Sequence, residues 1–264
     1  MKSAVNRTRE GGKFLSGVSL LTLSAVAVKV IGLAYRIPML RVLGTAGMGY
    51  FNTAYEVYAL LCVLSTAGLP VAMSVLLAGG DGAPAYRALS RRIYRVSLAV
   101  FCTIGVLGTA ALLLPARLWA EMLGNPDAAA SIRAVSPAVL AVCLAGAARG
   151  YFQGLSDMKP TAVSQVIEAL GKLILGLAFA YFAARRGAPL PVTAACGVLG
   201  LTAGTVASAA WLLFRLARQD RRAGDALPVD MPPVPLPGRR HILRRLAAVA
   251  LPVTLSAGVI SLTK

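Results

Sequence analysis

Six apolar runs, each long enough to cross a membrane, follow one another along the chain, and a seventh begins near its end. The expected spans are residues 14–34, 50–78, 96–114, 134–155, 161–184 and 191–214, with the last run starting at residue 246. A helix of about 20 apolar residues crosses the hydrocarbon core of a bilayer, where only helices and closed barrels satisfy every backbone polar group. The sequence therefore predicts an all-α, polytopic membrane protein.

Composition supports this prediction and excludes other classes. Hydrophobic residues make up 57% of the 264 residues and charged residues only 14%, whereas soluble domains have ~45–50% apolar and ~25% charged residues. The net charge of +17 does not indicate a nucleic-acid partner, because Lys and Arg lie in the gaps between apolar runs. The four cysteines have no metal-ligand spacing and there is one histidine, so we expect no metal site, no cofactor and no catalytic centre.

The distribution of basic residues predicts the domain order and the topology. Residues 1–13 form a basic tail, residues 14–214 a lobe of six helices, residues 215–245 a basic, Pro-rich linker, and residues 246–264 the start of a seventh helix. The tail, the loop expected at residues 79–95 and the linker carry most of the Lys and Arg residues. The positive-inside rule therefore places the N-terminus, and the linker with it, in the cytoplasm.

Four charged residues lie within or between the first two apolar runs: Lys29, Arg36, Arg41 and Glu56. A charge within a membrane-spanning helix is costly, and it usually faces a bundle interior or a wet cavity. We expect a polar cavity here, although Arg36 and Arg41 could instead reach the outer headgroups. Glu56 could pair with Arg36 or Lys29, or carry a proton.

Two further polar groups lie in the later spans. Glu168 and Lys172 are four residues apart with the acid first, a spacing that predicts a pair on one helix face. Another group gathers at the cytoplasmic end of the fourth span, where it forms either a gate or a solvated helix end; its members are Arg149, Gln153, Asp157 and Lys159. Tyr50, Tyr55 and Tyr58 are expected in an interfacial aromatic belt, with a sugar-binding platform as the alternative.

A short sequence repeat within the chain is relevant to the length of the protein. Thr22-Leu23-Ser24-Ala25 in the first run recurs as Thr254-Leu255-Ser256-Ala257 in the seventh. Many transporters are built from repeats of several helices. We therefore expect this chain to be the first half of a longer protein plus one helix, with a second lobe in cis.

Three parts of the sequence carry a family resemblance. The first is the order of residues from Lys29 to Gly44, and the second is Gly68-Leu69-Pro70-Val71-Ala72. The strongest likeness is in Arg149-Gly150-Tyr151-Phe152-Gln153-Gly154, followed by Met158-Lys159-Pro160-Thr161-Ala162. These parts resemble lipid-linked oligosaccharide flippases. The likeness is to the branch of stage V sporulation protein B and polysaccharide-biosynthesis proteins. These belong, with lipid II flippases and multidrug extruders of the MATE type, to the MOP exporter superfamily.

The resemblance implies the N-terminal lobe of a two-lobe transporter in a bacterial cell membrane. Its substrate would be a polyprenyl-pyrophosphate-linked oligosaccharide or a peptidoglycan precursor, and Lys29, Arg36 and Arg41 would meet the diphosphate. Lipid II flippases carry arginines in their second helix, whereas no Lys or Arg occurs here between Arg41 and Arg87. That departure favours the sporulation and polysaccharide branch.

Three other classes remain as alternatives. A multidrug or organic-cation antiporter would need an acidic cavity lining, and a membrane glycosyltransferase would need acidic metal-binding clusters, whereas the 10 acidic residues are scattered. A non-transporting membrane scaffold would pair its intramembrane charges completely.

Overall fold

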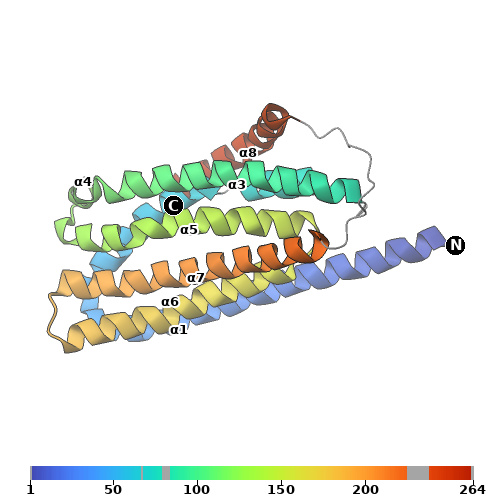
Figure 1. Ribbon diagram of the computed structural model, residues 1–264. Helices are drawn as coiled ribbons and strands as arrows, with labels where there is room; N and C mark the ends of the chain where they lie inside the picture. Colours follow the sequence, from blue (N-terminus) through green and yellow to red (C-terminus); the bar gives the residue numbers. More distant parts are fainter. Residues whose placement is uncertain (1, 67, 79–83, 225–237, 263–264) are drawn as a thin grey trace.

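The computed structural model describes residues 2–66, 68–78, 84–224 and 238–262 (Figure 1), and every element in these ranges is helical. In chain order the elements are α1 (Lys2–Thr66), α2 (Leu69–Leu77), α3 (Pro84–Leu113), α4 (Ala116–Met122), the 3-10 turn η1 (Pro126–Ala128), α5 (Ala129–Gly154), α6 (Lys159–Arg185), α7 (Leu190–Gly224) and α8 (Arg239–Leu262). The all-α membrane architecture expected from the apolar runs is confirmed.

Helix α1 consists of two legs that meet at Gly44. This residue has φ 64° and ψ −172°, a backbone conformation that is essentially restricted to glycine. The apolar segment Ser19–Val63 has 45 residues and would be about 67 Å long as a straight helix, more than twice the thickness of the hydrocarbon core. Figure 1 shows the chain turning back at the kink. The two legs, residues 2–43 and 45–66, thus correspond to the first two expected spans.

Four further segments are long and apolar enough to cross a membrane, and they match the third to sixth expected spans: Leu89–Leu113, Pro126–Gly154, Lys159–Arg185 and Leu190–Gln219. Two predicted boundaries were wrong. The loop expected at residues 79–95 belongs to α3 from Pro84 onward, and α7 continues ten residues past the predicted end at residue 214. Apolar pattern marks where a helix enters lipid, but a basic segment can continue the same helix beyond the bilayer.

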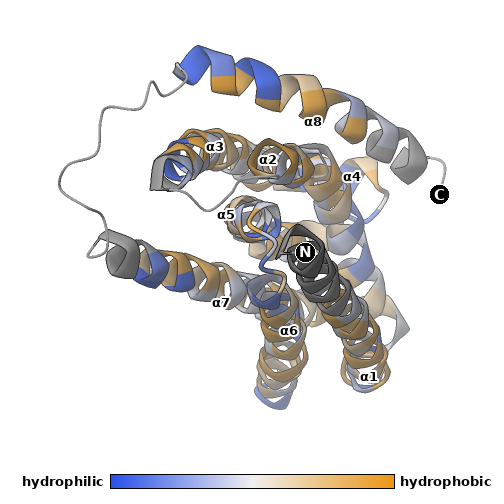
Figure 2. Ribbon diagram, turned by 90° about the vertical axis from the view of Figure 1, so that its right-hand side faces the viewer, coloured by the Kyte–Doolittle hydropathy of each residue, from blue (hydrophilic) through white to orange (hydrophobic). Residues whose placement is uncertain are grey.

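The linker expected at residues 215–245 is therefore helical at both of its ends. Helix α7 includes its first part, and α8 already begins at Arg239 rather than at residue 246. The part between them, residues 225–237, lies outside the described residues. Figure 2 shows α8 crossing α2 and α3 steeply, with its hydrophilic end at the start of the helix.

Helix α5 occupies the centre of the bundle and packs against α1, α2, α3 and α7. It separates two buried clusters: one contains Met39, Phe51 and Val135, and the other contains Met73 and Phe101. Large apolar side chains on α1, α3 and α6 are exposed on the outside. This is the pattern of helices that face lipid or another membrane-embedded part.

Helices α6 and α7 approach each other through glycines. A Cβ atom added at Gly171 would lie 2.5 Å from the Cα of Gly204, and one added at Gly200 would overlap the backbone of Gly176. Small residues allow such close backbone contact in membranes, where packing replaces the hydrophobic drive between helices. The two helices therefore form one tightly packed unit along this glycine seam.

Candidate functional site

Two adjoining cavities lie between α1 and α6. The larger, of about 590 Å³, is bounded by both legs of α1 and by α5, α6 and α7, and its polar lining consists of Lys29, Tyr35, Tyr55, Tyr58, Arg149, Gln165, Glu168 and Lys172. The smaller, of about 350 Å³, includes Arg36, Asn52 and Glu56. Tyr35, Tyr55 and Lys172 line both cavities. The apolar bundle thus contains a continuous polar region.

Arg149 connects three helices beside the larger cavity. From α5, its Nη2 atom donates to Glu168 Oε2 on α6 at 2.8 Å and to Ser208 Oγ on α7 at 3.1 Å. Its Nε atom donates to Ser164 Oγ at 2.9 Å. The side chains of Arg149 and Glu168 are only 18% and 30% exposed. Hydrogen-bonded ion pairs with this little exposure hold their helices in one geometry.

The predicted pair between Glu168 and Lys172 is therefore wrong. Both residues lie on α6 with the favourable spacing, but the carboxylate of Glu168 turns to Arg149, whose planar guanidinium offers several donors. Lys172 instead extends between aromatic rings of α1, with Nζ 4.9 Å from the ring centroid of Tyr55 and 5.1 Å from that of Tyr35. A partner from another helix has displaced the local one.

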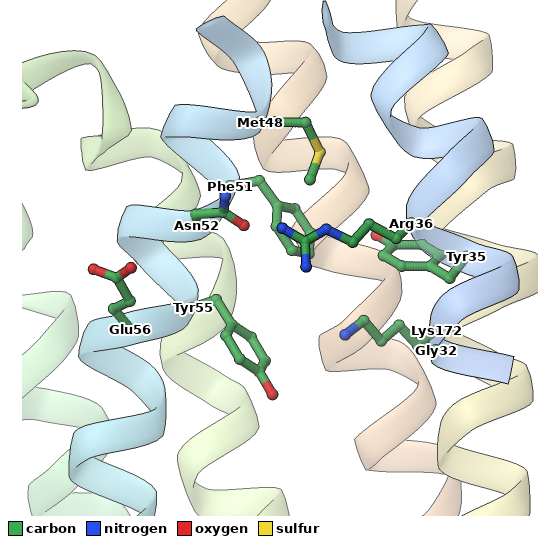
Figure 3. A pocket seen from close by; sticks show the side chains of 9 residues that line it. All are labelled: Gly32, Tyr35, Arg36, Met48, Phe51, Asn52, Tyr55, Glu56 and Lys172. Atoms are coloured by element: carbon green, nitrogen blue, oxygen red, sulfur yellow. The ribbon is translucent and has the colours of Figure 1, made fainter. Parts of the chain in front are cut away.

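The three predicted basic residues do not share one cavity. Lys29 lines the larger cavity and Arg36 the smaller. In Figure 3 the guanidinium of Arg36 reaches across toward Phe51, into the space between the two legs of α1. Arg41 is exposed and lines neither of these cavities. The expected headgroup-facing position therefore suits Arg41 better than a cavity-lining one.

Glu56 lines the smaller cavity but forms no ion pair with Arg36 or Lys29 within the described part of the chain, so the predicted pairing was wrong. Figure 3 shows its carboxylate on the side of the second leg that faces away from Arg36. The residue is exposed. Glu56 therefore borders the cavity at its edge, since successive helical residues diverge by about 100° and Tyr55 takes the position facing Lys172.

The predicted gate at the end of the fourth span is not assembled. Arg149 extends sideways into the hydrogen-bond network of α6 and α7, more than a helical turn before the end of α5. Asp157 Oδ1 accepts a bond of 3.3 Å from the backbone N–H of Lys159, at the start of α6. Gln153 is half-buried, and its carbonyl accepts from the backbone of Ser156. Gln153, Asp157 and Lys159 therefore belong to the hydrogen-bonded turn between α5 and α6.

The three tyrosines also differ from an interfacial belt. Tyr50 lies outside the linings of the two cavities, and its hydroxyl donates to Asp127 Oδ2 at 3.2 Å in the turn before α5. Tyr58 is buried beside the larger cavity, and Tyr55 lies against Lys172. Tyr55 and Tyr58 are three residues apart and share one face of the helix, so both rings face the polar region instead of the headgroups.

The two cavities together carry an excess of positive charge. Their basic residues are Lys29, Arg36, Arg149 and Lys172, while their acidic residues are Glu56 and Glu168. Of the residues predicted to form a cationic region, Lys29 and Arg36 line these cavities, and the prediction omitted Lys172 and Arg149. The sequence contained a signal for Lys172, since it is a lone base in the middle of an apolar helix.

A protein-family model described as "Polysaccharide biosynthesis protein" matches residues 14–264. The chain is 33% identical over 171 residues to the lipid II flippase MurJ of Bacillus subtilis, and 29% identical over 163 residues to stage V sporulation protein B of the same organism. Each match covers 61% of this chain and 31% of the relative, so the chain aligns with less than a third of either.

The fold also resembles a solved structure. A crystal structure of MATE in the straight conformation superposes with a TM-score of 0.71 at 18% identity, covering 92% of this chain and 52% of that protein. At this identity the likeness concerns the fold. The chain belongs to the polysaccharide biosynthesis protein family.

Proposed function

We propose that this chain forms one lobe of a transporter that flips a polyprenyl-pyrophosphate-linked oligosaccharide or peptidoglycan precursor across a bacterial cell membrane. The observation that carries the proposal is the excess of basic side chains around the two cavities, in a bundle that is otherwise apolar. A lipid-linked substrate keeps its tail in the bilayer, whereas its diphosphate and sugars need a polar path.

The diphosphate is the most demanding part of such a substrate. Burying an unpaired anion in hydrocarbon is prohibitive, so the path must supply cations. Arginine binds phosphate oxygens with two parallel hydrogen bonds, and lysine offers a compact positive charge. Lys29 and Arg36 lie in adjoining cavities that share lining residues. They can therefore contact one anion in succession, or together.

The remaining features follow from the same proposal. The relatives are about three times as long as the region that this chain matches, and we infer that a second lobe provides the facing cavity wall. The lobes would rock around the substrate by alternating access. The basic N-terminal tail and the basic ends of α7 and α8 would lie in the cytoplasm, according to the positive-inside rule.

The test replaces Lys29 and Arg36 with alanine in the full-length protein and follows a fluorescent undecaprenyl-pyrophosphate-linked sugar in vesicles. Each charge-assisted hydrogen bond contributes ~1.5–3 kcal/mol, so the double variant should flip at least ~100-fold more slowly. The matched control is Arg41→Ala, which removes the same charge outside both cavities and should retain flipping. A double variant that flips at the original rate would refute the proposal.

Export of organic cations is a second candidate, because aromatic rings line the cavities and the fold resembles that of MATE. Rings of this kind can hold an organic cation. The basic lining opposes it, since a cationic drug would meet Lys29, Arg36 and Lys172. We expect vesicles containing the protein to move the lipid-linked sugar but not ethidium. The reverse result would favour the antiporter.

A further inference from the structure

Lys172 occupies a cage of three aromatic rings in the polar region. Its Nζ atom lies 4.9 Å, 5.1 Å and 5.9 Å from the ring centroids of Tyr55, Tyr35 and Phe51. Figure 3 shows the ammonium group extending from α6 into the space between the two legs of α1, which carry the rings. The cage therefore consists of side chains from three helical segments.

Within the described part of the chain the ammonium group forms no ion pair, although the carboxylate of Glu168 is close enough to act on it electrostatically. Glu168, one turn before it on α6, gives its carboxylate to Arg149. Ring faces attract a cation but satisfy its N–H donors only weakly. In addition, the hydroxyl of Tyr35 is buried without a hydrogen-bond partner. Lys172 thus offers unused N–H donors where the linings of the two cavities overlap.

We propose that Lys172 binds the diphosphate of the lipid-linked substrate, and that the rings of Tyr35, Phe51 and Tyr55 position its ammonium group while the cavity is empty. This inference rests on the proposed function. It names the central anion-binding residue, because Lys172 borders both cavities, whereas Lys29 and Arg36 each border one.

Lys172 should leave the aromatic rings and bind the diphosphate when substrate enters the cavity. A charge-assisted hydrogen bond to a phosphate oxygen is stronger than the attraction of a cation to a ring face. Lys172 would therefore turn from the rings to the anion when substrate arrives. A carboxylate partner would have opposed this movement, because breaking a buried ion pair leaves an uncompensated charge. The aromatic cage holds the lysine without such a penalty.

The test observes the lysine directly by NMR of the full-length protein in lipid nanodiscs, with lysine labelled by 13C at Cε. The Cε resonance of Lys172, identified by its loss in Lys172→Arg, should be shifted upfield by the ring currents of the cage. Farnesyl diphosphate and inorganic pyrophosphate are the two probes, and farnesol is the control without phosphate. We expect both diphosphates, but not farnesol, to move the Lys172 resonance downfield. The stronger probe shows whether the prenyl chain adds affinity.

Binding measurements complete the test. Lys172→Met keeps a chain of similar length in the cage and should weaken binding of farnesyl diphosphate about tenfold or more. Arg117→Met, which removes an exposed charge far from the cage, should not. If the diphosphates move the Lys29 resonance and leave Lys172 in place, Lys172 is structural and this inference fails while the proposed function stands. If neither resonance moves, or if farnesol acts as well as farnesyl diphosphate, both fail.

Discussion

The pair formed by Arg149 and Glu168 should stabilise the bundle measurably, and its coupling free energy can be worked out from the structure. The two side chains are 18% and 30% exposed, and their atoms are 2.8 Å apart. Breaking a fully buried pair by removing one partner costs ~3–5 kcal/mol. Because both groups retain some exposure, we expect a coupling free energy of about 2 kcal/mol, near the value for a charge-assisted hydrogen bond.

The assay is a double-mutant cycle on the free energy of unfolding, measured by reversible SDS titration of the full-length protein in mixed micelles. The variants are Arg149→Met, Glu168→Met and their combination, which isolates the pairwise term. Arg117 and Glu121 provide the matched control, because their side chains are 80% and 49% exposed at 3.1 Å. Such exposed i,i+4 pairs contribute ~0.3–0.5 kcal/mol. Equal coupling in the two cycles would refute the claim that the cavity pair is energetically special.

Two further predictions concern glycines and use the same unfolding assay. Gly200→Ala should destabilise the protein by about 1–3 kcal/mol, because its methyl group would overlap the backbone of Gly176. The control Gly49→Ala, at a helical position with open space around it, should be neutral or stabilising by up to about 1 kcal/mol. An equal loss of stability in both variants would contradict the close approach of α6 and α7. Gly44→Ala should cost about 1–3 kcal/mol although nothing surrounds this position, because its φ of 64° suits only glycine; an unchanged free energy of unfolding would show that the kink is relaxed.

The helices themselves could be predicted because lipid leaves few alternatives. An apolar run of sufficient length must satisfy its own backbone, so α5 and α6 were located to within about five residues. The predicted start of the third span was wrong, because the basic segment before it already belongs to α3. The predicted end of the third span at residue 114, however, lies next to the end of α3 at Leu113. The ends of α7 and α8 could not be placed, since the basic residues there continue a helix outside the apolar run.

The partners within the site were harder to predict than the helices. The i,i+4 spacing rule considers only residues of the same helix, so it predicted a pair between Glu168 and Lys172. The structure brings Arg149 of α5 to Glu168 and the rings of α1 to Lys172. Which of two competing partners wins depends on how the helices are rotated against one another. That rotation is set by close contacts such as Gly171 against Gly204, which are visible only after the bundle is assembled.

The glycine seam between α6 and α7 has a mechanical consequence for the cavity. Turning either helix about its axis would drive a side chain into the neighbouring backbone, and Arg149 ties α5 to the same pair through Glu168 and Ser208. We therefore expect α5, α6 and α7, which form three walls of the cavity, to move together as one rigid unit. The remaining wall is α1, whose two legs meet at Gly44 and which contacts the other three helices through apolar packing and through the ring faces around Lys172. Any change in the width of the cavity within this lobe should originate there.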